Sequence, residues 1–218
     1  MLISRRASSA RKTRNAEPTW QEPYQLVAQQ LLGKVQLAEF VETASRVARN
    51  SSITLVALHR EQLPLARQFV CELRKWADPE RASLLWLCND AASCAFLQQN
   101  GFEKMTFPPA EGYLLVERLR VALYASMLGY NVLLADPGAV WLKNPWPWLV
   151  GPFDVIAAPE QRFGEGYGFP LGADFLCVRS SSASISLLLR LLQRAEVARA
   201  QTVREAASIF GDALNEEL

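Results

Sequence analysis

Short aliphatic runs alternate with helical segments along the chain, and this alternation constrains the fold more than any other feature. Strands that alternate with helices are typical of βαβ units, whose strands form a mainly parallel sheet. We therefore expect an α/β protein with a mainly parallel central sheet. The predicted strands are 53–58, 83–88, 103–107, 131–135, 154–158 and 173–178, and the predicted helices are 64–76, 91–99, 114–128, 182–199 and 202–218, after one or two helices in 21–49.

The charge distribution argues against nucleic acid as the main partner. The chain of 218 residues has a net charge of +1, from 23 basic and 22 acidic residues. Five of the basic residues lie in 1–15, which has no acid, so the rest of the chain is mildly acidic. Nucleic-acid-binding domains are usually strongly basic. We expect a disordered basic arm over 1–20, a helical lead-in over 21–50 and one domain over 51–218.

The N-terminal arm allows three interpretations. It is rich in Ser and Arg, and it has no apolar stretch typical of a secretory signal. The composition fits an organelle transit peptide, a disordered basic arm, or the cut end of a longer sequence. No apolar run in the chain has the length that crosses a bilayer, so we expect no transmembrane segment.

The cysteines and the single histidine limit the metal chemistry. Cys71, Cys88, Cys94 and Cys177 form no CxxC pair, and each has apolar neighbours, so buried free thiols are expected. A disulfide between Cys71 and either Cys88 or Cys94 is the alternative in a secretory lumen. Because His59 is the only histidine, a His-based zinc site is practically excluded.

Two loops have features that bear on function. Asn50-Ser51-Ser52 is an Asn-x-Ser sequon, which has meaning only in a secretory lumen. The 159–170 loop contains three glycines, and such loops commonly lie over a ligand.

Polar residues follow the predicted strands, where open α/β sheets bind ligands. These residues are His59, Asn89, Asp90 and Asp136. A carboxylate at this edge, such as Asp136, can hold a divalent cation together with a diphosphate. The alternative is a plain type II turn, with Asp136 at its first position, then Pro137 and Gly138.

No standard phosphate loop, dinucleotide fingerprint or GxSxG elbow is present. Trp141, Trp146 and Trp148 could stack on a sugar or a base, although packing is the more common role of clustered tryptophans.

The stretch LGYNVLLADPGAVWLKNP (128–145) resembles the signature of the nucleotide-diphospho-sugar transferase domain, which reads Gly-Tyr-Asn-Val-Leu-x-x-Asp-x-Asp-x-x-Trp-Leu-[Arg/Lys]-[Asp/Asn]-Pro. This domain occurs in transferases related to the plant enzymes that act on extensin and rhamnogalacturonan II. Further similar segments are ITLVALHR (53–60), SLLWLCNDAASCAFLQQNGF (83–102), ADFLCVRSS (173–181) and ALNEEL (213–218), so the resemblance covers about 51–218.

The resemblance implies a GT-A-like, Rossmann-like α/β/α sandwich that binds a nucleoside diphosphate sugar, expected to be a UDP-sugar. It implies transfer of the sugar to a glycan or glycoprotein acceptor with retention at the sugar carbon, a Mn²⁺ or Mg²⁺ ion held by Asp-x-Asp, and a Golgi location. The residues expected to contact the nucleotide are His59, Asp90, Arg118, Asp136 and Trp141. Arg118 stands where the family usually has lysine.

This sequence departs from the family pattern at the metal motif. Gly138 replaces the second aspartate of Asp-x-Asp, which leaves Asp136 as the metal ligand. Gly172-Ala173-Asp174 stands where the family usually has Asn-x-Gly before the later strand. Asp174, at the opposite edge of the presumed cleft, is expected to supply the replacement catalytic carboxylate, and the alternative is an ordinary aspartate at the start of a strand. Asp212 is a weaker candidate. The alternative function is a non-catalytic GT-A-like binding module that has lost its metal site.

Overall fold

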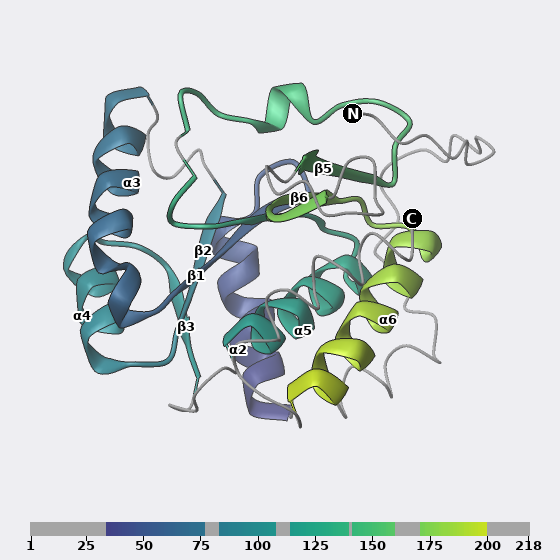
Figure 1. Ribbon diagram of the computed structural model, residues 1–218, viewed down its shortest axis with the longest axis horizontal. Coiled ribbons are helices and arrows are strands. Elements are labelled where there is room, and N and C mark those ends of the chain that lie inside the picture. Colours follow the sequence, from purple (N-terminus) through teal and green to yellow (C-terminus); the bar gives the residue numbers. More distant parts are fainter. Residues whose placement is uncertain (1–33, 77–82, 108–113, 140, 160–170, 200–218) are drawn as a thin grey trace, which may run out of the picture.

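The computed structural model describes residues 34–76, 83–107, 114–139, 141–159 and 171–199 (Figure 1). The helices are α2 (Lys34–Val47), α3 (Leu63–Trp76), α4 (Ala91–Gln99), α5 (Leu114–Met127) and α6 (Ser182–Arg199), with short 3-10 helices η1 (Arg60–Gln62) and η3 (Trp146–Trp148). The strands are β1 (Ser52–Leu58), β2 (Leu84–Cys88), β3 (Lys104–Thr106), β4 (Asn131–Ala135), β5 (Val155–Pro159) and β6 (Leu171–Val178).

The six strands form one sheet in the order β3-β2-β1-β4-β6-β5. The pairs β3–β2, β2–β1 and β1–β4 are parallel, whereas β6 runs antiparallel to both β4 and β5. The predicted mainly parallel α/β sheet is therefore confirmed, and β6 is the exception. Its reversed direction matters for the site, because it brings the first residues of β6 to the edge where β4 ends.

Alternating side chains of each strand build a core on either face of the sheet. In β4, Val132 and Leu134 pack on one face, and Leu133 and Ala135 pack on the other, as the two-residue period of a strand requires. All four are fully buried. A strand with apolar residues on both of its sides is typical of a sheet covered by helices on both faces.

The helices form the outer two layers of the sandwich (Figure 1). Helices α2, α5 and α6 supply the core on one face, and α3 and α4 supply it on the other. The predicted lead-in helix contributes Phe40, Ala44 and Val47 to the first of these cores. It therefore shares one core with the sheet.

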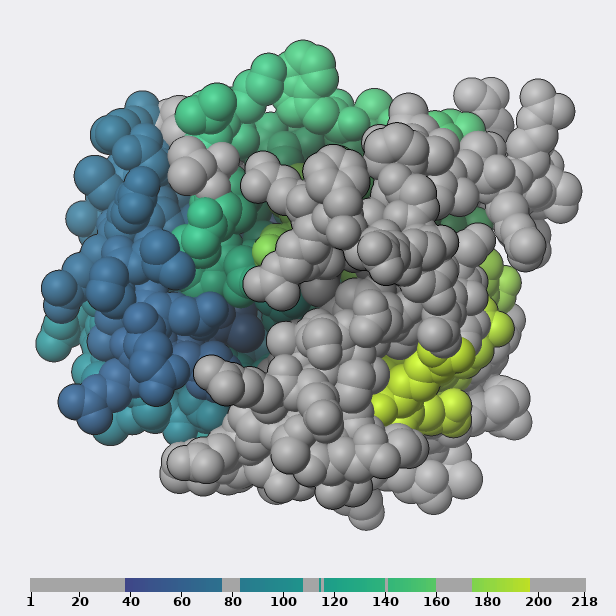
Figure 2. Space-filling model, in the orientation of Figure 1, coloured from purple at the N-terminus to yellow at the C-terminus, as the bar shows by residue number. Residues whose placement is uncertain are grey.

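The segment between β4 and β5 passes over the α3 side of the sheet. The indole N–H of Trp146 donates to Thr54 Oγ1 of β1 at 3.1 Å, which ties the segment to the centre of the sheet. Beyond this anchor the segment between β4 and β5 lies on the surface of the molecule (Figure 2). Trp148 in this segment is 66% exposed. The Lys143 ammonium lies 3.8 Å from the centre of the Trp148 ring.

Most predicted elements agree with the structure to within one or two residues, and strand 131–135 agrees at both ends. The predictions for 1–33, for most of the 159–170 loop and for the helix 202–218, which includes Asp212, lie outside the described residues. Within the described residues, no helix is both long enough and apolar enough to cross a membrane.

The prediction of four buried free thiols is wrong at Cys71, Cys88 and Cys94. Cys88, the last residue of β2, forms a disulfide with Cys94 in the first turns of α4. The alternative that paired Cys71 with one of them is also wrong, since Cys71 is a free, exposed thiol on α3. Cys177 is free and buried, as expected. Spacing could not reveal the bond, because the turn from β2 into α4 is what brings the two sulfurs together.

Candidate functional site

The candidate site lies where the strand order reverses. Strand β1 pairs with β2 on one side and with β4 on the other. The chain therefore adds β2 and β3 on one side of β1, and it adds the later strands on the other side. Ligands of open α/β sheets bind outside the carboxyl ends of strands at such a switch point. His59 follows β1 and Asp136 follows β4, so both stand at this switch.

Asp136 and Asp174 face one another at this edge. The main-chain N–H of Asp136 donates to the carbonyl oxygen of Asp174 at 3.1 Å, one residue beyond the paired Ala135 and Phe175. Burial raises the pKa of Asp136 to about 6; the charge of Arg118 opposes the rise, and a side-chain hydrogen bond and the negative charge of Asp174 add to it. Two carboxylates this close repel one another when both are ionised. The pair is therefore a site of concentrated negative charge.

Arg118 of α5 lies beneath this acidic pair. Its side chain is 3% exposed, and its Nη1 lies 3.8 Å from Asp136 Oδ1 and 3.5 Å from the carbonyl oxygen of Ala135. Burial lowers the pKa of the guanidinium, and the charges of Asp136 and Asp174 oppose that change. At 3.8 Å the ion pair is longer than a hydrogen bond, so Arg118 acts on Asp136 mainly as a buried positive charge.

The residues after Asp136 form a tight turn. The N–H of Ala139 donates to the carbonyl oxygen of Asp136 at 3.0 Å, which closes a four-residue turn with Pro137 at its second position. The predicted type II geometry is wrong, because that turn needs a positive φ at its third position and Gly138 is not among the positive-φ glycines. Gly138 is therefore not required here by backbone conformation.

Asp90 and His59 lie on the same edge, at the ends of the adjacent strands β2 and β1. Asp90 caps α4, since its carboxylate accepts from the Ser93 N–H at 2.9 Å and from Ser93 Oγ at 2.6 Å. Burial alone would raise the pKa of Asp90, but these bonds and those from the Ala92 and Arg60 N–H groups lower it overall. The structure shows a capping role for Asp90, and nucleotide contacts by Asp90 and His59 stay predictions.

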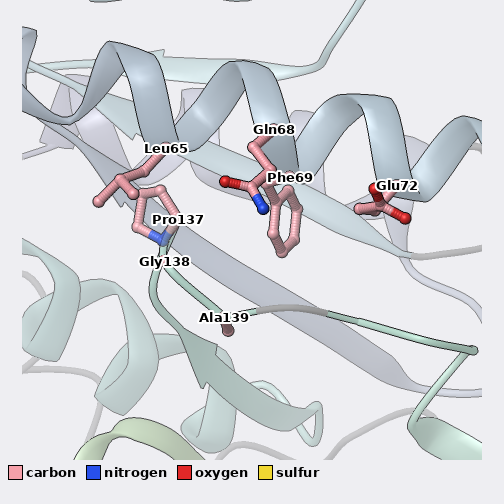
Figure 3. Close-up of a pocket in the computed structure, with 7 residues that line it drawn as sticks. All are labelled: Leu65, Gln68, Phe69, Glu72, Pro137, Gly138 and Ala139. Atoms are coloured by element: carbon pink, nitrogen blue, oxygen red, sulfur yellow. The ribbon is translucent and has the colours of Figure 1, made fainter.

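A shallow hollow separates the Asp136 turn from α3 (Figure 3). Leu65 and Phe69 of α3 point toward Pro137 and Gly138 across it, and Glu72 lies farther along the same helix. The hollow holds about 10 Å³, which is room for one water molecule. The hollow at the switch point is therefore too small to enclose a nucleotide. The sequence pattern did not single out these α3 residues.

Trp141 does not point into the candidate site. It is 5% exposed, and its ring meets that of Phe69 edge to face with centres 5.2 Å apart. The structure shows the packing role for this tryptophan. Stacking of Trp141 on a nucleotide stays a prediction and would require the ring to leave this core.

The described residues contain no group of three or more His, Cys, Asp and Glu side chains that could hold a metal ion. The acidic pair of Asp136 and Asp174 is thus the strongest described candidate for a cation. Their carboxylate oxygens are the hard ligands that Mg²⁺ and Mn²⁺ prefer. Magnesium sites of this kind often use one or two carboxylates and take their other ligands from water and substrate phosphates.

Comparison with known proteins agrees with the fold and with the signature around Asp136. The sequence model of the nucleotide-diphospho-sugar transferase family matches residues 83–217, which is more than half of the chain. The match begins at β2 and includes Asp90, Arg118, Asp136 and Asp174, whereas β1 and α3 precede it. No curated protein matches the chain significantly. The chain belongs to the nucleotide-diphospho-sugar transferase family.

Proposed function

We propose that this protein binds a nucleoside diphosphate sugar, with UDP as the nucleotide, at the β1–β4 switch point and transfers the sugar to a glycan or glycoprotein acceptor. The observation that supports this most strongly is the pairing of Asp136 with Asp174 at that edge. Family membership supports a glycosyltransferase-like activity.

In this proposal Asp174 supplies the carboxylate that Gly138 lacks. The family motif places its second aspartate two residues after the first, and here that position carries no side chain. Asp174 enters from the neighbouring antiparallel strand and restores a two-carboxylate set. Asp136 and Asp174 would hold a Mn²⁺ or Mg²⁺ ion. Such an ion would neutralise the diphosphate leaving group.

Arg118 would set the charge of the site. Two carboxylates without a counterion would repel both each other and a diphosphate. The buried guanidinium already offsets part of this charge, and a divalent cation would offset the remainder. In this arrangement Arg118 positions Asp136 and need not touch the donor.

Activity measurements on matched variants test the proposed function. The protein is incubated with a panel of UDP-sugars and Mn²⁺, and free UDP is measured with and without candidate glycan acceptors. We expect UDP release that requires metal, falls at least about a hundredfold in Asp136→Asn, and is unchanged in Asp154→Asn. Asp154 is a suitable control because it adjoins Val155, which pairs with Val178 at the far end of β6.

Two outcomes would contradict a catalytic role. UDP release that is equal in wild type and Asp136→Asn would remove Asp136 from the chemistry. Donor binding without any turnover over the whole panel would favour the non-catalytic binding module, for which the missing carboxylate at Gly138 is the supporting observation.

A further inference from the structure

The turn that joins α2 to β1 carries a sequon in an exposed position. Arg49 and Ser52 form an isolated antiparallel bridge, with N–H to carbonyl bonds of 3.2 Å and 3.0 Å in the two directions. Asn50 and Ser51 form the two-residue connection, with φ values of 51° and 54°. Such a connection directs its two central residues away from the chain, and both are exposed.

Asparagine suits this position for a conformational reason. Among residues with a Cβ, Asn and Asp adopt the left-handed region most readily. The turn thus favours Asn at position 50 whether or not it is modified. Ser52 begins β1 and completes the Asn-x-Ser triplet, and its hydroxyl donates to the carbonyl oxygen of Asn50 at 3.3 Å across the turn.

The disulfide supplies an independent observation about the compartment. Bonds such as Cys88–Cys94 form and persist in oxidising compartments and are rare in the cytosol. The secretory lumen is oxidising, and it is also where Asn-x-Ser triplets become glycosylated. The disulfide and the sequon therefore point to the same environment from unrelated parts of the chain.

We propose that Asn50 carries an N-linked glycan. In the modification, Asn50 Nδ2 loses a proton and bonds to the anomeric carbon of an oligosaccharide. The bond from that carbon to the diphosphate of a lipid-linked donor breaks, and the lipid diphosphate leaves. The triplet must be recognised while the chain is still extended, because Ser52 is only 8% exposed in the folded protein. This inference does not depend on the proposed transferase activity.

The position of Asn50 leaves the candidate site accessible. Asn50 lies before the first residue of β1, whereas Asp136 lies after the last residue of β4, and these strands are parallel neighbours. Five residues of strand separate the two edges, or about 17 Å. A glycan at Asn50 would extend from the edge of the sheet opposite to the acidic pair.

Mass spectrometry of the protein isolated from its own cells tests the proposal. Peptide:N-glycosidase F is applied in heavy-oxygen water, which converts a glycosylated Asn50 to labelled aspartate. We expect labelled aspartate at position 50 and a gel mobility shift that the glycosidase removes. An unlabelled Asn50 in the recovered protein would overturn the proposal, whether the Cys88–Cys94 peptide is found oxidised or reduced.

Variants introduced at the native locus separate the sequon from other modifications. Asn50→Gln and Ser52→Ala each destroy the triplet, whereas Ser52→Thr keeps it. We expect the glycosidase-sensitive shift to vanish in the first two and to persist in Ser52→Thr. A shift that survives Ser52→Ala would contradict N-linked modification of Asn50.

Discussion

Asp136 and Asp174 stand opposite one another across the antiparallel β4–β6 pair, and a main-chain hydrogen bond of 3.1 Å joins Asp136 N–H to the Asp174 carbonyl oxygen. Residues that face each other across such a pair project their side chains to the same side of the sheet. The register of the two strands therefore fixes the distance between the carboxyl groups. Neither strand can shift by one residue without losing its buried face.

Asp174→Asn should lower the pKa of Asp136 from about 6 toward its ordinary value. Burial and Arg118 would still act on Asp136, but the negative charge of Asp174 that raises its pKa would be gone. Carbon-detected NMR titration of the Asp136 carboxyl group, in the presence of EDTA, measures this value. Asp154→Asn serves as the control and should leave it unchanged. An Asp136 titration that is identical in wild type and Asp174→Asn would show that the two groups do not interact.

The raised pKa of Asp136 makes folding stability depend on pH. Between its ordinary value of 3.8 and about 6, the folded protein holds a proton that the unfolded chain releases. Stability from this group is therefore full below pH 4 and is lost as the pH rises through 6. The pKa difference corresponds to about 3 kcal/mol, and screening of the 31% exposed side chain reduces the expected loss to about 2 kcal/mol.

Urea unfolding at pH 4 and pH 7, in EDTA, measures this dependence. Residue 136 cannot ionise in Asp136→Asn. When the pH is raised from 4 to 7, the free energy of unfolding of this variant should therefore rise by about 2 kcal/mol relative to that of the wild type. An equal change with pH in both proteins would contradict the raised pKa.

Gly138→Asp should fold normally and bind Mn²⁺ more tightly. A Cβ at this position would meet only Leu65 Cδ1, at an ordinary 3.7 Å, and the backbone is not left-handed. We expect a stability change within about 0.5 kcal/mol and an affinity gain of about tenfold or more, because the carboxylate count of the site rises. Gly138→Asn adds a side chain of the same size without charge and should show no such gain. Equal Mn²⁺ affinities for the Asp and Asn variants would contradict the prediction.

Removal of the disulfide by the double substitution Cys88→Ala and Cys94→Ala should lower the free energy of unfolding by about 2 kcal/mol. The bond closes a short loop, with a sequence separation of 6, so the entropy that it removes from the unfolded chain is modest. Urea unfolding measures the effect, and Cys71→Ala, which alters a free and exposed thiol, is the control. No loss in the double variant, together with no effect of dithiothreitol on the wild type, would contradict this account.

The sequence predicted the strands and the edge of the sheet well, because both depend on local patterns. Residues 131–135 are apolar at nearly every position, which specifies a strand covered on both faces, and Asp136 ends it. The direction of β6 has no local signal. The contact of Asp136 with Asp174 follows from that direction, so the sequence could offer Asp174 only as a hypothesis.

The other differences between the predictions and the structure arise from the packing of elements that are distant in the sequence or meet at a turn. Trp141 is near the signature in sequence, but Phe69 of α3 covers its ring. The Cys88–Cys94 bond depends on the angle at which the chain turns from β2 into α4, which no residue spacing encodes.

Mn²⁺ binding, followed by electron paramagnetic resonance of free Mn²⁺ at pH 7 with and without UDP, tests the central claim most directly. The account predicts one site whose affinity rises when UDP is present and falls at least about tenfold in both Asp136→Asn and Asp174→Asn, with Asp154→Asn like the wild type. Wild-type affinity in Asp174→Asn would contradict the claim that this carboxylate takes the place of the one missing at Gly138.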